Sequence, residues 1–311
     1  MSGKRRCAII LIAVCIGTIT NGQEIDPEGA PTWLIFEKGK QLFDSGEFGE
    51  SLLFFRTARG RRSPFPEVEY WIGRVFEAEG ELSLAERQYL AALEIAQYLE
   101  TPDDEFVIRY QLANLYIITH RYSKYEQSLD DIIGLERSRR KSASIIDIDP
   151  QLLVETLLGR GLDKLLELYR LDDYGGVEAY FRSGVYRYRR GFFNRAAEDL
   201  IYGIVITSTN ILDYLLDRDP EYRFSTIESM IVDITRHRAL VDYAQSMGFF
   251  GQIYALGLSL HDSQDARRIN LARDMWRVIS GYGPKGSPWV VKSRLQLASP
   301  FADQLGIIFT D

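Results

Sequence analysis

One spacing rule recurs along the chain and restricts its fold more than any other feature. Counted from Gly73, the rule places a small residue at 0, a bulky one at +3, glycine at +7, an apolar residue at +9, and then small, bulky and small residues at +12, +16 and +19. An earlier copy, which begins at Gly39, matches at every position. Small and bulky residues at these distances fit two closely packed helices, and glycine fits a left-handed turn between them. The sequence therefore predicts stacked helical hairpins.

Two further copies match less closely. The third begins at Ala113 and is longer than the first two, and its extra residues fall around 101–104, where a longer helix or loop absorbs them. The fourth begins at Gly184, and its unit spans 177–206. These copies extend the expected hairpins into the second half of the chain.

The period from Gly39 to Gly73, with this alternation, resembles that of the tetratricopeptide repeat (TPR), a family of helix-turn-helix units that stack into a superhelix. The resemblance covers three units in residues 32–135 and one more in 177–206. It implies an all-α fold, an α-solenoid of TPR-like repeats, in which the first helix of each unit lines a concave face. It also implies that the partner is a protein or a peptide.

The rest of the sequence is helical but lacks a diagnostic spacing. Residues 136–149 contain several basic side chains without apolar periodicity, so we expect a linker there. Residues 150–311 should form a second helical repeat region that ends in a C-terminal cap, and 151–169 is amphipathic enough for one long helix that starts after Asp149. Gly248 indicates the turn of a fifth unit.

Residues 1–22 differ from the rest of the chain. Basic residues at 4–6 precede an apolar run at 7–19, which predicts a cleaved signal peptide over 1–22 and a linker over 23–31. A run of roughly 13 apolar residues is shorter than the roughly 20 that a membrane-spanning helix needs. Cys15 loosely matches a lipoprotein signal, so a lipid anchor or a retained leader stays an alternative. We expect export to the periplasm or cell envelope.

Charge and cysteine content argue against several classes of function. The chain has a net charge of −7, and loss of the three basic residues in the leader would change it to −10. An acidic chain lacks the broad positive field that attracts nucleic acid or anionic lipid. Both cysteines, Cys7 and Cys15, lie in the expected leader. The exported form would therefore have no thiol for disulfides, catalysis or metal binding.

Motifs for catalysis or cofactor binding are weak. The three histidines lack the spacing of metal ligands, and no phosphate-binding loop or nucleophile elbow is present. Glu228 and Ser229 are the only trace of a cell-wall hydrolase signature, and the basic, aromatic run at 186–190 lies within a repeat helix rather than in a nucleic-acid site. We expect no enzyme activity, cofactor, metal or nucleic acid. A cell-wall hydrolase or an accessory ligand-binding subunit of a transporter is the alternative.

The expected concave face supplies the candidate site. In the repeat family, side chains at −6, −3, +1, +4 and +5 from the small residue face the groove, and these offsets share one helical face. An aromatic residue stands at −3 in all four units. The expected groove residues are Trp33, Phe36, Lys40, Phe43, Tyr70, Arg74, Glu77, Tyr110, Asn114, Phe181 and Tyr188. Aromatic rings with interspersed charges suit a protein segment, so the predicted function is a non-enzymatic scaffold that binds an envelope protein.

Some members of the repeat family hold a C-terminal carboxylate with a set of Lys, Asn and Arg side chains. Here Phe36, Trp71 and Val107 occupy three of those places. We therefore do not expect this chain to bind carboxylate termini in that way.

Overall fold

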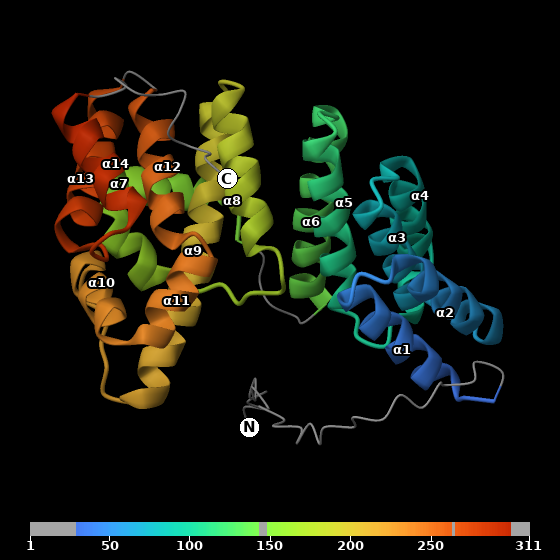
Figure 1. Cartoon of the computed structure of the whole chain (residues 1–311). Helices are drawn as coiled ribbons and strands as arrows, with labels where there is room; N and C mark the ends of the chain where they lie inside the picture. Colours follow the sequence, from blue (N-terminus) through green and yellow to red (C-terminus); the bar gives the residue numbers. More distant parts are fainter. Residues whose placement is uncertain (1–28, 143–147, 263–264, 300–311) are drawn as a thin grey trace.

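The computed structural model describes residues 29–142, 148–262 and 265–299 (Figure 1). The expected signal peptide and the last residues of the expected cap lie outside these ranges. In the described part the chain forms fourteen α-helices, one 3-10 turn and no strand, so the predicted all-α solenoid is confirmed. The helices are α1 (Thr32–Asp44), α2 (Phe48–Arg61), α3 (Pro66–Ala78), α4 (Leu82–Glu94), α5 (Asp104–Ile118), α6 (Tyr122–Ser142), α7 (Pro150–Leu168), α8 (Val177–Arg189), α9 (Phe193–Arg218), α10 (Ile227–Arg236), α11 (Arg238–Ser246), α12 (Phe249–His261), α13 (Ala266–Tyr282) and α14 (Pro288–Ala298), and the 3-10 turn is η1 (Ala96–Tyr98).

Four helical hairpins reproduce the spacing rule: α1 with α2, α3 with α4, α5 with α6, and α8 with α9. The residue at +7 has a left-handed backbone in every one, with φ of 81° at Gly46 and Gly80, 56° at His120 and 78° at Gly191. Glycine adopts this conformation without a side-chain penalty, which explains its place in three of the four turns. The predicted turns are confirmed, and the third hairpin makes the same turn with histidine.

Close packing within each hairpin depends on the small residue at its origin. A methyl group added at Gly73 would lie 2.6 Å from the Tyr89 ring, and one at Gly39 would lie 2.7 Å from the Phe55 ring. Each ring stands at +16 from its glycine, as the rule requires. The small residue therefore lets the second helix approach, and the bulky one fills the space between the helices.

The fourth hairpin stacks on the third, and part of the expected linker is helical. α6 continues through residues 136–142 and packs against α8. The linker prediction is wrong for these residues because Glu136 and Arg140, one turn apart on the helix, form an ion pair with both side chains fully buried. One face of this basic helical segment is therefore buried through Glu136 and Arg140, although the segment has no apolar periodicity. Residues 143–147 lie outside the described part of the chain.

In the C-terminal half, α7, α8, α11 and α12 pack against α9, which has 26 residues (Figure 1). α7 starts at Pro150 as expected, and the Asp149 side chain accepts a hydrogen bond from the Gln151 amide at 2.9 Å. The expectation of one continuous helix over 151–169 is wrong, because Gly161 has a φ of 82° and breaks α7. A positive φ of this kind favours glycine.

The expected fifth turn is present, but the helix that follows it, α12, packs mainly against helices other than α11. Gly248 has a left-handed backbone (φ 65°) between α11 and α12. α12 lies mainly against α9 and α13. Gly257 leaves room for the fully buried Trp276, because a methyl group at Gly257 would lie 2.5 Å from the indole nitrogen. The glycine at the expected bulky place therefore fits a large partner from α13.

Among the described helices, α9 has the length and apolar composition of a membrane-crossing helix. However, 78% of its most apolar window is buried inside the protein. Neighbouring helices cover its hydrophobic surface, so α9 is the core of the C-terminal half.

A partly buried ion network joins the third and fourth hairpins. The Arg187 guanidinium on α8 donates to Asp199 on α9 at 2.6 Å and to Asp130 on α6 at 2.5 Å. Burial raises the pKa of the Asp199 carboxyl to about 6, although the charge of Arg187 opposes this shift.

Because of Asp199, the free energy of unfolding should fall as the pH rises from about 4 to about 6. In this window the native protein retains a proton that the unfolded chain, with a carboxyl pKa near 3.8, has already released. Urea unfolding at pH 4, 5 and 6 would measure the slope, which Asp199→Asn should reduce. Asp131→Asn is the control, because it removes an exposed carboxylate of α6 that accepts from Gln127 and lies outside this network, and its slope should match that of the parent. Equal slopes in the parent and Asp199→Asn would contradict this assignment.

Candidate functional site

A cleft of about 370 Å³ lies between the first helices of the first three hairpins. Its walls come from α1, α3, the loop after η1, and the start of α5. The lining residues are Phe36, Lys40, Glu67, Tyr70, Trp71, Leu99, Glu100, Thr101, Asp104, Val107 and Ile108. Three of them, Phe36, Lys40 and Tyr70, belong to the expected groove, and Glu67 and Val107 stand at the −6 offset of the same face.

Aromatic rings line one side of the cleft. The rings of Tyr70 and Trp71 meet edge to face with centroids 5.9 Å apart. The Lys40 ammonium lies 5.5 Å from the centroid of Phe36 and 5.9 Å from that of Trp71, and it also donates to Glu37 at 2.9 Å. The chain's own cation therefore covers part of these ring faces, and its charge is balanced by a neighbour.

Arg74 and Glu77 continue this face toward the end of α3. The Arg74 guanidinium donates to the Tyr70 hydroxyl at 3.1 Å and lies 5.4 Å from the centroid of Phe43. Glu77 accepts a hydrogen bond from the side-chain Nε2 of Gln111 on α5 at 2.7 Å. These expected groove residues lie together, and they also connect the second hairpin with its neighbours.

Tyr110 and Asn114 bond to the fourth hairpin. The Tyr110 hydroxyl donates to the Gly175 carbonyl and accepts from the Ala179 amide, both at 3.0 Å. The Asn114 side chain accepts from Arg182 at 2.6 Å. Both residues therefore hold two hairpins together, and their polar atoms are engaged within the chain.

In the fourth hairpin the chain's own C-terminal helices cover the expected groove. The ring of Phe181 meets Trp289 of α14 edge to face at 6.5 Å, and a methyl group added at Gly251 of α12 would touch both rings. Tyr188 is 8% exposed and packs against Phe193. The prediction that Phe181 and Tyr188 face an open groove is wrong, because Trp289 of α14 covers the Phe181 ring and Tyr188 is buried against Phe193 of α9.

Three apolar side chains on the first helices are exposed. Trp33 on α1 is the most exposed of them, and Val107 and Ile118 on α5 are 49% and 56% exposed. Val107 also lines the cleft. Exposed apolar side chains beside an aromatic cleft are typical of a surface that binds another protein.

The spacing rule missed part of the cleft. Trp71 stands one place after the −3 column, and Leu99, Glu100 and Thr101 belong to the insertion before α5. The extra length of the third unit was the signal that this loop exists, although not that it borders the groove. Phe36, Trp71 and Val107, which were expected at the places that bind a carboxylate in the tetratricopeptide family, line the cleft together.

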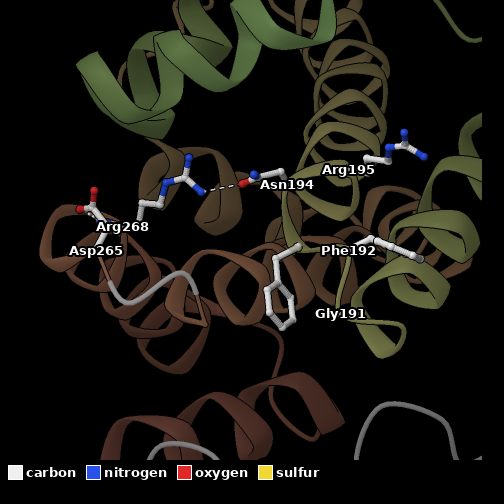
Figure 2. A pocket seen from close by; sticks show the side chains of 7 residues that line it. Gly191, Phe192, Asn194, Arg195, Asp265 and Arg268 are labelled. Carbon is white, nitrogen blue, oxygen red and sulfur yellow. Dashed lines mark hydrogen bonds between the residues drawn. The ribbon is translucent and has the colours of Figure 1, made fainter.

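A second cleft, of about 540 Å³, lies between the turn that starts α9 and the start of α13 (Figure 2). Arg268 donates to the Asn194 side chain at 2.9 Å, while Asp265 accepts from the Arg267 and Arg268 amides at the start of α13. Figure 2 shows Arg195 pointing away from Arg268. The polar groups of this cleft therefore do not converge on one point.

The motifs considered for catalysis serve structure in the folded chain. Ser229 and Thr226 form a capping box at the start of α10, with the Ser229 amide donating to the Thr226 hydroxyl at 3.2 Å. Arg187, in the basic run at 186–190, is held by two aspartates. Within the described ranges, no three His, Cys, Asp or Glu side chains lie close enough together to hold a metal ion.

Comparisons with known proteins find relatives without an assigned function. No family model matches the sequence. An uncharacterized protein of Borreliella burgdorferi is 23% identical over 291 residues, which cover 86% of this chain and 90% of that protein. An uncharacterized protein of Treponema pallidum is 29% identical over 136 residues, which cover 44% of this chain and 32% of that protein.

One similar solved structure is an assembly chaperone of RpL4, Acl4 (residues 1–338). It has a TM-score of 0.27 and 12% sequence identity, and the match covers 81% of this chain and 95% of that one.

Proposed function

We propose that this chain is a non-enzymatic, tetratricopeptide-like scaffold that binds a segment of a partner protein along its first-helix face. One observation carries the proposal: an aromatic cleft and exposed apolar side chains lie together on α1, α3 and α5. Protein interfaces combine such anchors with a polar rim. The four left-handed turns at +7 support the likeness to the repeat family.

The proposed setting is the cell envelope, and the sequence of residues 1–22 is its support. The basic start and the apolar run have the features of a signal peptide. Mass spectrometry of the N-terminal peptide of the protein recovered from cells would test this. Cleavage near Gly22, or a lipid on Cys15, would support export, and an intact leader in the cytosolic fraction would reject it.

Replacing Val107 and Ile118 with serine should reduce the recovery of a partner from envelope extracts by about tenfold or more. Loss of two exposed apolar anchors removes contact area that only the complex buries, and one anchor at the centre of an interface contributes about 2 kcal/mol or more. The measurement is affinity capture with the full chain, followed by quantitative mass spectrometry.

The matched control replaces Leu53 and Leu90, which lie on second helices and are 60% and 46% exposed. This control should capture the partner as the parent does. Circular dichroism should show equal helicity and melting for both variants. Undiminished capture by the Val107 and Ile118 variant, or equal loss in both variants, would contradict the proposed surface.

A further inference from the structure

Some of the charged side chains that line the cleft form ion pairs with neighbouring residues, and we call these the balanced set. The others form no such pair within the described ranges. The balanced set consists of Lys40, which pairs with Glu37, and Glu100, which pairs with Arg62. The Arg62 guanidinium also lies 4.4 Å from the centroid of Phe65, which holds this pair at the edge of the cleft. These four groups contribute little net charge to a ligand in the cleft.

Two carboxylates of the lining, Glu67 and Asp104, make no ion pair among the described residues. Glu67 accepts from the Glu100 amide through Oε1 at 2.7 Å, while its Oε2 is covered and accepts no hydrogen bond in the described structure. Buried carboxylate oxygens normally have a donor. Burial raises the pKa of Asp104, and the neighbouring Asp103 adds to the shift. The cleft therefore presents negative charge that the chain does not neutralise.

In the fourth hairpin, a side chain of the chain itself covers Phe181, the aromatic residue at −3. There Trp289 of α14 packs against Phe181, and the Lys292 ammonium lies 4.7 Å from the Trp289 ring. The helix that carries them, Pro288–Ala298, contains Lys292 and Arg294 and no acidic residue. An aromatic side chain from a basic segment thus covers, within this chain, the −3 aromatic of the fourth hairpin, although the helix that carries it packs mainly against α13.

We infer that the partner segment bound in the cleft is basic and carries an aromatic anchor, with its lysine or arginine donating to Glu67 and Asp104. This inference rests on the proposed protein-binding function and specifies its ligand. The aromatic side chain packs against Tyr70, Trp71 and Val107, whose apolar surfaces line the cleft. A carboxylate terminus is disfavoured, because it would meet two like charges in a partly desolvated site.

Fluorescence anisotropy with the full chain tests the inference. The probe is a labelled peptide with the sequence of residues 288–298, and its analogue has glutamate in place of both basic residues. The parent should bind the basic peptide at least about tenfold more tightly than the acidic analogue, and added salt should weaken binding because the charges are screened. Glu67→Gln combined with Asp104→Asn should lose about tenfold in affinity for the basic peptide.

The matched control, Glu79→Gln with Glu94→Gln, removes two exposed carboxylates outside the cleft and should bind as the parent does. Equal affinity of the cleft variant and this control would overturn the inference, as would the absence of binding by the basic peptide. The peptide could instead displace α14 from the fourth hairpin. Its affinity would then be the same for the cleft variant and the control, and this result would also overturn the inference.

Different results would contradict the proposed basic ligand and the proposed protein-binding surface. If the acidic analogue binds as well as the basic peptide and Val107→Ser with Ile118→Ser abolishes both, the inference about charge fails while the protein-binding surface stands. If partner capture survives the Val107 and Ile118 replacement, the surface itself fails.

Discussion

Replacing Glu136 with alanine should lower the free energy of unfolding by about 3–5 kcal/mol, because it leaves a buried charge without its partner. Glu136 and Arg140 are both fully buried in α6, and the Tyr180 hydroxyl donates to the second carboxylate oxygen at 3.0 Å. Arg140 otherwise donates to the Asp172 carbonyl at 3.1 Å, and its Nε and Nη1 have no partner in the described structure. After the carboxylate is gone, the Tyr202 ring, 5.3 Å from the guanidinium, and the Asp173 carboxylate would compensate only part of the charge.

A double-mutant cycle measured by urea unfolding separates the charge effect from lost packing. Glu136→Ala combined with Arg140→Met should be less destabilised than the sum of the two single variants, because the pair is then replaced by uncharged groups. Additive losses in the cycle would show that the two charges do not depend on each other.

Replacing Tyr89 with alanine should cost about 3–5 kcal/mol, the range for deleting a buried aromatic side chain. The Tyr89 ring is fully buried, fills the space that Gly73 leaves, and contacts Tyr70 with centroids 5.8 Å apart. Tyr89→Phe should cost less, about 1.5–3 kcal/mol, because it removes only the hydrogen bond that the hydroxyl donates to Glu77.

The same pair allows a sharper test of why Gly73 is small. In the parent, Gly73→Ala should destabilise the protein by about 1–3 kcal/mol, because the new methyl group meets the Tyr89 ring. In the Tyr89→Ala background the same change should stabilise it by up to about 1 kcal/mol, because alanine favours the helix over glycine and only the looser contact with the Ala85 carbonyl, at 3.3 Å, is left. The check is urea unfolding of all four proteins. The same sign of effect in both backgrounds would mean that the ring does not set the size of this residue.

The spacing rule predicted the features that are local to a hairpin. A positive φ at Gly46 and Gly80 and the contact of Gly73 with Tyr89 follow from residues less than one repeat apart. The face of α1 and α3 that carries Phe36 and Tyr70 follows as well, since one helical face fixes it.

The spacing rule could not predict contacts between residues that are far apart in the sequence. The buried face of α6 depends on Glu136 being covered by Tyr180 of α8. Phe181 is covered by Trp289, which lies far along the chain and belongs to no repeat. The loop with Glu100 borders the cleft only because it folds back over α3, whose Glu67 accepts its amide.

α9 divides the molecule into two parts with different cooperativity. Each of the first three hairpins packs mainly against its sequence neighbours, so their stabilities combine like links in a linear array, and opening can begin at α1 and stop there. From α7 onward the helices form one hydrophobic core: α7, α8, α11 and α12 pack against α9, while α10, α13 and α14 join this core through α7, α11 and α12. The cleft therefore lies in the part of the chain that can open one hairpin at a time. The helices from α7 onward should instead unfold together.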